Sequence, residues 1–260
     1  MLKTVFSWVL RLVPRPVLQR FGHVAARFLG LFYQGKAVEC PICQRQYSKF
    51  LPYGRGNSAR DNALCPGCLS LERHRLMWLY LQRKKDFFQK TLKVLHVAPE
   101  YCFIRRFEAL PHLDYITADL ESPLAKVKMD IHQIPFPENS FDVVFCNHVL
   151  EHVEDHVKAL TELYRVLRPG GWAIIQSPQQ MERFETYEDK SITDPREREK
   201  HFLQSDHYRI FGRNYAEELR KGGFVVYEDR FVMDTLGQDE VKRFALPADE
   251  IIYDCRKLDV

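Results

Sequence analysis

The chain has 260 residues, of which 45% are hydrophobic and 13% aromatic, which is enough for one substantial domain and a small accessory module. This composition excludes a low-complexity or repeat protein. Net charge is only +3, but residues 1–90 carry 16 Lys and Arg against four acids, so the remainder is acidic. The basic third suggests an anionic partner, either nucleic acid or a membrane surface, or alternatively a solvated face that binds nothing.

Residues 1–38 form a basic N-terminal region in which two amphipathic helices are predicted, over 2–13 and 17–32, separated by Pro14-Arg15-Pro16. Such helices can lie in a lipid interface or dock on their own domain, and the sequence leaves both alternatives open. Arg11 interrupts the first apolar run, and no apolar stretch reaches the roughly 18 residues needed to span a bilayer. We therefore expect a cytoplasmic protein, either free or peripherally membrane-associated.

Residues 39–90 are expected to form a cysteine module followed by a connecting helix over 69–90. Cys40 and Cys43 make one CxxC pair, Cys65 and Cys68 make another, and 21 residues separate the pairs. This spacing lets four thiolates converge on one zinc ion, as in zinc ribbons. Because sulfur fills all four positions, the zinc is expected to be structural.

From residue 91 the sequence alternates between β-rich runs and helical segments. A helix is predicted over Val153–Leu167, and it ends at the stop signal Arg168-Pro169-Gly170-Gly171. Strands alternating with helices predict an α/β fold with a parallel sheet covered on both faces. The predicted strands are Leu92–Val97, Tyr115–Ala118, Phe141–Asn147, Trp172–Gln176, Phe224–Tyr227 and Glu250–Asp254.

Two stretches carry a family resemblance: "MDIHQIPFPENSFDVVFCNHVLEHV" and "ELYRVLRPGGW". They resemble the class I S-adenosylmethionine-dependent methyltransferases, in the subgroup that includes quinone-biosynthesis and other small-molecule enzymes. The resemblance is good from Leu92 to about Pro178 and loose beyond. It implies a Rossmann-like, mostly parallel seven-stranded sheet over 91–260 and an enzyme that uses S-adenosylmethionine.

The resemblance also implies residue roles in a cofactor site. Asp119 would bind the ribose, as its position 19 residues after Glu100 also suggests. Asp130 would bind the adenine amino group while Ile131 packs on the ring, and Asn147 would lie near the methionine moiety. The candidate cofactor-binding residues are His96, Ala98, Glu100, Asp119, Leu120, Asp130, Ile131 and Asn147.

The turn after the first strand departs from the family pattern. Members usually have an acid in that strand and glycines after it, whereas here His96 replaces the acid and Ala98-Pro99-Glu100 replaces the glycines. Glu100 would compensate by pairing with the α-amino group of the cofactor. We therefore predict a variant cofactor site. The alternative is a non-catalytic binding protein on a degenerate methyltransferase scaffold.

His148, at the end of a strand, is the candidate catalytic base. The four-residue spacing of His148, His152 and His156 also resembles a metal site, but the family pattern accounts for part of it, and a second metal is not expected. Residues 179–214 are expected to form a substrate lid. Candidate substrate contacts are His152, His207, Tyr208, Arg209 and Arg213.

The predicted function is methyl transfer to an unidentified small-molecule or lipid- or saccharide-linked acceptor. A second hypothesis is a zinc-ribbon methyltransferase of rRNA or tRNA, with the cysteine module and the basic helix 69–90 holding the RNA, because phosphate contacts dominate such binding. Against it, no aromatic stacking platform is evident in the sequence.

Overall fold

The computed structural model describes residues 26–54 and 59–259. Most of the predicted N-terminal helical region therefore lies outside the described residues. The chain divides into two compact units, and each is described by itself. One contains the described residues up to Asp86 together with Phe231–Glu250, and the other contains Phe87–Arg230 and the chain from Ile251 onward.

The second unit is built on a seven-stranded sheet with the order β12-β13-β9-β8-β5-β6-β7. Its strands are β5 (Leu92–Val97), β6 (Leu113–Asp119), β7 (Val127–Lys128), β8 (Phe141–Asn147), β9 (Leu167–Gln176), β12 (Val225–Asp229) and β13 (Ile252–Arg256). The neighbours from β9 to β7 pair in parallel, and β13 runs antiparallel to both β9 and β12. This confirms the predicted fold class. The short β7 was not predicted.

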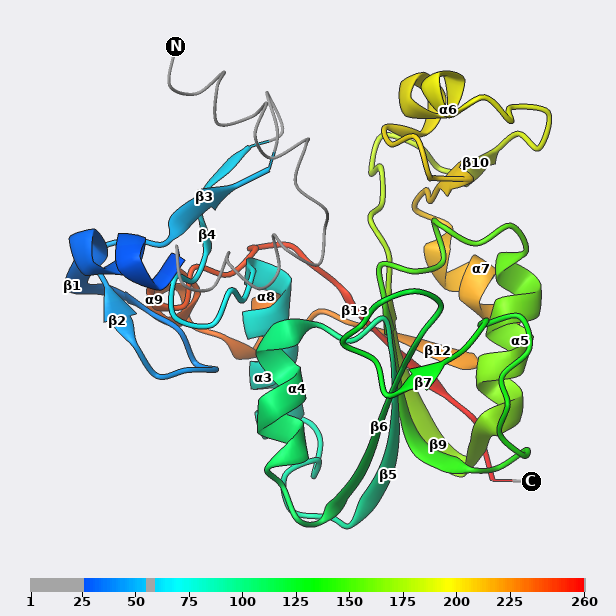
Figure 1. Cartoon of the computed structure of the whole chain (residues 1–260), viewed down its shortest axis with the longest axis horizontal. Coiled ribbons are helices and arrows are strands. Elements are labelled where there is room, and N and C mark those ends of the chain that lie inside the picture. Colours follow the sequence, from blue (N-terminus) through cyan, green and yellow to red (C-terminus); the bar gives the residue numbers. More distant parts are fainter. Residues whose placement is uncertain (1–25, 55–58, 260) are drawn as a thin grey trace. The chain divides into compact units, whose positions relative to one another are not determined.

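Helices cover both faces of this sheet, with α4 (Tyr101–Glu108) on one side and α5 (His156–Val166) and α7 (Tyr215–Arg220) on the other (Figure 1). Burial on both faces explains why β8 is apolar at nearly every position. Asp155, rather than Val153, sets the start of α5, because its carboxylate accepts a hydrogen bond from the backbone N–H of Lys158 at 2.9 Å.

The segment predicted as a lid forms a small substructure within this unit. It contains α6 (Pro195–Phe202) and an antiparallel pair of strands, β10 (Tyr187–Glu188) and β11 (Arg209–Ile210). Figure 1 shows α6 and β10 beyond the carboxyl ends of the parallel strands. In folds of this kind ligands bind at that end of the sheet, so the segment lies where a lid would act.

The first unit contains two β-hairpins, each followed or interrupted by a CxxC pair. Their strands are β1 (Gln34–Glu39), β2 (Gln46–Tyr47), β3 (Leu51–Tyr53) and β4 (Arg60–Leu64). The helical elements are η1 (Leu31–Tyr33), α3 (Glu72–Arg83), α8 (Phe231–Thr235) and α9 (Gln238–Arg243). Two boundaries differ from the predictions: a strand begins at Gln34, inside the region expected to be helical, and α3 is shorter than 69–90.

Phe231–Glu250 belongs to the same compact unit as the cysteine module, whereas the prediction placed it in a domain over 91–260. The reason is the fully buried guanidinium of Arg75. It donates to the carbonyls of Phe244 and Ala245, both at 2.7 Å, and to that of Ala63 at 2.8 Å. A buried cation needs such acceptors, and they come from segments far apart in the sequence.

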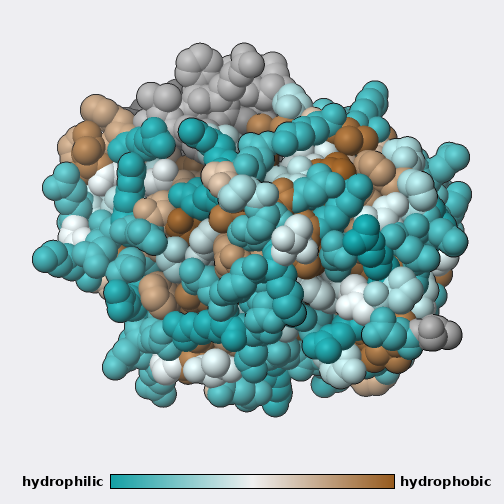
Figure 2. All heavy atoms as spheres, turned by 90° about the horizontal axis from the view of Figure 1, so that it is seen from below, coloured by the Kyte–Doolittle hydropathy of each residue, from teal (hydrophilic) through white to brown (hydrophobic). Residues whose placement is uncertain are grey.

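The side chains on one face of the molecule are mostly hydrophilic. On the face drawn in Figure 2, hydrophilic side chains predominate and the apolar ones are scattered among them. Within 26–54 and 59–259, no helix combines the length and the apolar character that crossing a bilayer would require.

Candidate functional site

The sheet has a topological switch point between β5 and β8, because the chain continues from β5 to β6 on one side and from β8 to β9 on the other. In open α/β sheets, ligands bind in the crevice outside the carboxyl ends of the strands at such a point. The loop after β5 carries Ala98 and Glu100, β6 ends at Asp119, and β8 ends at Asn147. The predicted cofactor residues therefore follow adjacent strands of the sheet.

Ala98, in the turn after β5, adopts a left-handed backbone conformation that glycine adopts more easily than alanine. Its φ is +50°, in the left-handed region, which costs a non-glycine residue about 1 kcal/mol. A hydrogen bond from its N–H to the carbonyl of Ala118, at 2.9 Å, holds the turn beside β6. The turn is thus made without glycine, at the expense of local strain.

Glu100 is the centre of a hydrogen-bonded chain at this turn. Its Oε2 lies 2.5 Å from His96 Nε2, and its Oε1 accepts a hydrogen bond from Asn147 Nδ2 at 3.1 Å. His96 Nδ1 lies 2.7 Å from the hydroxyl oxygen of Tyr115. Burial raises the pKa of Tyr115, with the charge of Glu100 adding to the effect, so the hydroxyl stays protonated. Tyr115 was not predicted from the sequence as part of the site.

Asp119 is the last residue of β6, and Leu120 follows it. Asp119 Oδ1 accepts hydrogen bonds from the backbone N–H groups of Glu121 and Ser122, at 2.8 and 2.6 Å, which fixes the carboxylate. Leu120 is 54% exposed, unusual for a leucine beside a polar site. An exposed apolar side chain next to a fixed carboxylate suits a ligand with both a ring face and hydroxyl groups.

Asp130 and Ile131 lie in the loop after β7. Asp130 is exposed, and its Oδ1 accepts a hydrogen bond from the backbone N–H of His132 at 2.9 Å. That bond, together with the His132 ring, holds the pKa of Asp130 below its usual range. Ile131 is 6% exposed and packs in the main core.

His148, the candidate base, follows β8 directly. It is held in a left-handed backbone conformation, with φ at +55°. Its Nδ1 lies 3.5 Å from Oε1 of the buried Glu151, whose Oε2 accepts a hydrogen bond from Ser177 Oγ at 2.9 Å. Although burial alone would raise it, the interaction with His148 lowers the pKa of Glu151. Strained residues of this kind concentrate at functional sites.

The predicted substrate contacts divide between the loop after β8 and the inserted segment. His152 and His207 lie together, with ring centroids 4.6 Å apart. Burial lowers the pKa of His207, and the neighbouring His152 adds to the shift. His156 instead pairs with Glu218 at 3.0 Å, which separates it from the other two predicted members of a histidine set.

The remaining three candidates are placed differently. Arg209 is fully buried, and its guanidinium donates to the carbonyls of Leu150, Val153 and Glu154, so it holds the loop after β8 in place. The Tyr208 ring lies under the Arg198 guanidinium, 4.0 Å from its centre. Arg213 is exposed and lies over Phe184.

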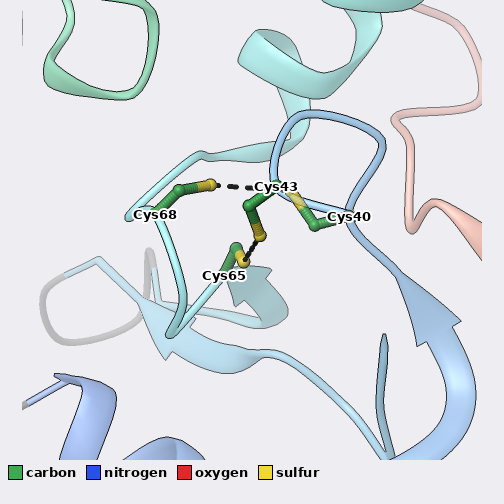
Figure 3. A group of neighbouring side chains, drawn as sticks. All are labelled: Cys40, Cys43, Cys65 and Cys68. Atoms are coloured by element: carbon green, nitrogen blue, oxygen red, sulfur yellow. Dashed lines mark hydrogen bonds between the residues drawn. The ribbon is translucent and has the colours of Figure 1, made fainter. Parts of the chain in front are cut away.

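The four cysteines of the first unit converge (Figure 3). Their sulfurs all lie within 4.8 Å of one another, and Cys40–Cys68 and Cys43–Cys65 are both 3.6 Å apart. A disulfide would require about 2.05 Å. A tetrahedral zinc ion with Zn–S bonds of about 2.3 Å separates its sulfurs by about 3.8 Å. The spacing therefore fits a metal ion and not a disulfide.

The two CxxC turns share one backbone design. Gln44 N–H donates to the carbonyl of Cys40 at 2.7 Å, and Leu69 N–H donates to that of Cys65 at 2.8 Å. Gln44 and Leu69 both have φ near +60°, although neither is glycine. Two equivalent turns therefore present four sulfurs to one point, as a metal site requires.

The four cysteine side chains also shift one another's pKa. Against the effect of burial, hydrogen bonds with the other cysteines lower the pKa of Cys40. Interaction with Cys40 in turn raises the pKa of Cys65 and of Cys68. Four thiolates so close together, three of them buried, would need a cation, and Zn²⁺ would supply that charge.

Comparison with known proteins supports the assignment of the second unit. Residues 106–175 match a family described as a methyltransferase domain. The match begins within α4, after the unusual turn, and ends in β9. The strand order around it, with antiparallel β13 between β9 and β12, is the seven-stranded arrangement that the resemblance implied. Residues 106–175 therefore match a methyltransferase domain, within a sheet whose strand order is the one that the resemblance implied.

Curated relatives match this chain over short stretches. An uncharacterised methyltransferase of Schizosaccharomyces pombe is 52% identical over 42 residues, which cover 16% of this chain and 15% of the relative. The ubiquinone/menaquinone biosynthesis C-methyltransferase of Pseudoalteromonas translucida is 43% identical over 49 residues, which cover 19% of this chain and 20% of that enzyme. The chain thus spans at most a fifth of the length of these two relatives.

A solved structure with a similar arrangement is the 1,6-didemethyltoxoflavin-N1-methyltransferase of Burkholderia thailandensis, with bound 1,6-didemethyltoxoflavin and S-adenosylhomocysteine. It is 16% identical to this chain, with a TM-score of 0.46, over 80% of this chain and 99% of that one.

Proposed function

We propose that the protein is an S-adenosylmethionine-dependent methyltransferase that binds its cofactor at the carboxyl ends of β5, β6 and β8. The observation that carries the proposal is the fixed carboxylate of Glu100, which His96 and Asn147 hold at the switch point of the sheet. A carboxylate at this place suits the α-ammonium group of the cofactor. Asp119 and the exposed Leu120 would meet its ribose and adenine.

The cofactor supplies a methyl group on a sulfonium, which is a good leaving group. The protein then has three tasks: to hold the acceptor in line, to exclude water and to accept a proton where the acceptor carries one. His148, which follows β8 and lies 3.5 Å from the Glu151 carboxylate, is suited to the third task. Residues 179–214 would serve the second, as a lid beyond the same end of the sheet.

We infer that the acceptor is a small molecule rather than RNA. Quinone-biosynthesis enzymes are among the relatives that match parts of this chain. In addition, two arginines of α3, the helix assigned to RNA binding in the alternative hypothesis, already have partners. Arg75 is buried among carbonyls, and Arg83 pairs with Glu240 at 2.6 Å. Neither guanidinium is presented as a free phosphate contact.

The cysteine module is proposed to hold one structural zinc ion through Cys40, Cys43, Cys65 and Cys68. Since all four ligands are protein sulfurs, the ion has no open position for chemistry. An anionic partner of the basic N-terminal region, whether a lipid surface or RNA, stays a prediction.

Calorimetric titration with S-adenosylmethionine and, separately, S-adenosylhomocysteine tests the proposal directly. We expect saturable binding of both, and substantially weaker binding after Asp119→Asn. A folded protein that binds neither compound would support the alternative of a non-catalytic scaffold. A competition assay with RNA and with anionic vesicles, run at two salt concentrations, would identify the anionic partner.

A further inference from the structure

A second group of metal-binding side chains lies in the methyltransferase domain, far along the sequence from the cysteines. It consists of Glu151 and His152, on the loop after β8, and His207, two residues before β11. Each contributes one donor atom, and these atoms lie within 4.8 Å of one another. Glu151 and His207 are buried, whereas about a third of the His152 side chain is exposed.

Both imidazoles are held through Nδ1. His207 Nδ1 lies 3.0 Å from the carbonyl oxygen of Phe202, so it carries the proton and donates it. His152 Nδ1 lies 3.2 Å from Asp206 Oδ2. Metal-binding histidines usually donate one ring N–H to a carbonyl or carboxylate, which leaves the other nitrogen free to bind the ion. The two histidines match this arrangement.

The remaining nitrogen of His207 is the strongest indication of a ligand. His207 Nε2 is buried and has no hydrogen-bond partner among the described residues. An unsatisfied buried nitrogen destabilises the fold, and a bound ion would remove that cost. His207 is 94% buried. Because its Nδ1 carries the proton, Nε2 carries a lone pair that can bind an ion.

Glu151 supplies the charge that such a site requires. Glu151 is 98% buried as a residue, and its carboxylate receives one hydroxyl hydrogen bond, from Ser177. The His148 ring lies 3.5 Å away, longer than a good hydrogen bond. A buried carboxylate normally has a full positive charge beside it, and a metal ion would provide one.

The backbone around the three side chains is fixed in advance. Arg209 binds the carbonyls of Leu150, Val153 and Glu154, which clamps the loop that carries Glu151 and His152. Tyr208 N–H donates to the Glu151 carbonyl at 2.8 Å, which joins that loop to the segment with His207. A site of this kind loses little conformational entropy when it binds an ion.

We propose that Glu151, His152 and His207 bind a divalent transition-metal ion through one carboxylate oxygen and two imidazole nitrogens. Two imidazoles and a carboxylate suit Zn²⁺, Fe²⁺, Co²⁺ or Ni²⁺, whereas Mg²⁺ and Ca²⁺ prefer oxygen alone. Bonds of about 2.1 Å require donors roughly 3–3.6 Å apart, so the most exposed side chain, His152, rotates inward.

The position of the site gives it a role in the proposed reaction. Because Glu151 Oε1 lies 3.5 Å from His148 Nδ1, the ion would lie near the candidate base, where an oxygen atom of the acceptor could enter an open coordination position. A bound ion lowers the pKa of such a hydroxyl group. This role rests on the proposed function, but the binding of the metal does not.

The test uses the full-length protein with zinc already in the cysteine module. Addition of Co²⁺ is followed by calorimetry and by visible absorption. We expect one further equivalent of cobalt per chain, with d–d bands and no sulfur-to-cobalt charge-transfer band, since the ligands lack sulfur. His207→Asn keeps a donor for the Phe202 carbonyl but removes Nε2, and it should abolish this equivalent.

His201→Ala is the matched control, because His201 is an exposed histidine of α6 in the same segment, and it should bind cobalt as the wild type does. Asp206→Asn should weaken binding about 10- to 100-fold. Asp206 is half exposed, so this variant keeps the test decisive if His207→Asn does not fold. No further equivalent in the wild type, or equal binding in both site variants, would overturn the inference. Intact binding of S-adenosylmethionine in that case would leave the proposed function standing.

Discussion

Replacement of Glu100 by glutamine tests the cofactor site at its centre. The substitution keeps the volume of the side chain and one acceptor oxygen, but it removes the charge and turns an N–H donor toward either His96 or Asn147, which approach the two carboxylate oxygens at 2.5 and 3.1 Å. A hydrogen bond to a charged group contributes about 1.5–3 kcal/mol. The Kd for S-adenosylmethionine should therefore rise roughly 10- to 150-fold.

The assay is calorimetric titration of both proteins at the same pH, and Glu108→Gln serves as the matched control. Glu108 is at the other end of the same helix, where it pairs with Lys126 at 2.7 Å on the surface. That variant should bind as the wild type does. If Glu100→Gln bound the cofactor with unchanged affinity while remaining folded, the carboxylate would not contact the cofactor, and our account of the turn would be wrong.

Three further predictions concern stability. Chelation should release one zinc ion per chain and unfold the two hairpins of the cysteine module, as measured by metal analysis and amide hydrogen exchange; a zinc-free protein with protected hairpins would contradict this. Asp155→Ala should lower the free energy of unfolding by about 1 kcal/mol because α5 loses its N-cap, whereas Asp155→Asn should lose much less. The hydrogen bond from His156 lowers the pKa of Glu218, so its stabilising effect is complete above about pH 4.3 and is lost as the pH falls through the lower folded-state pKa. Glu218→Gln should therefore flatten the acid side of the stability profile measured by urea unfolding.

Most of the sheet could be predicted because its signals are local. The run Phe141–Asn147 is apolar at nearly every position and forms β8 with the predicted bounds. The domain boundary at the other end of the chain could not be predicted. Phe231–Glu250 joins the cysteine module through the carbonyls of Phe244 and Ala245, which bind Arg75. Backbone carbonyls have no side-chain signature, so this long-range contact leaves no pattern in the sequence.

The candidate site, too, could be predicted from the sequence only in part. The positions of Asp119 and Asn147 at strand ends follow from the carboxyl-end rule for parallel sheets. Arg209 was predicted as a substrate contact because it lies in the segment expected to form a lid; in the structure its guanidinium is buried against three carbonyls. The approach of His207 to Glu151 depends on that clamp. No spacing rule connects residues 56 positions apart, so the cluster becomes visible only in three dimensions.

The unusual first turn is best explained as a rearrangement of the usual one. The family places an acid in the first strand and glycines after it, and here the strand carries His96. Its Nε2 approaches Glu100, the residue that precedes α4, and Asn147 at the end of β8 holds the other oxygen of the same carboxylate. Ala98 meanwhile adopts the left-handed conformation that a glycine would supply. A turn that had lost its function would not be expected to keep a strained alanine and a partly buried carboxylate with two hydrogen-bond partners, since both cost stability. That cost supports our proposal that the site binds a cofactor.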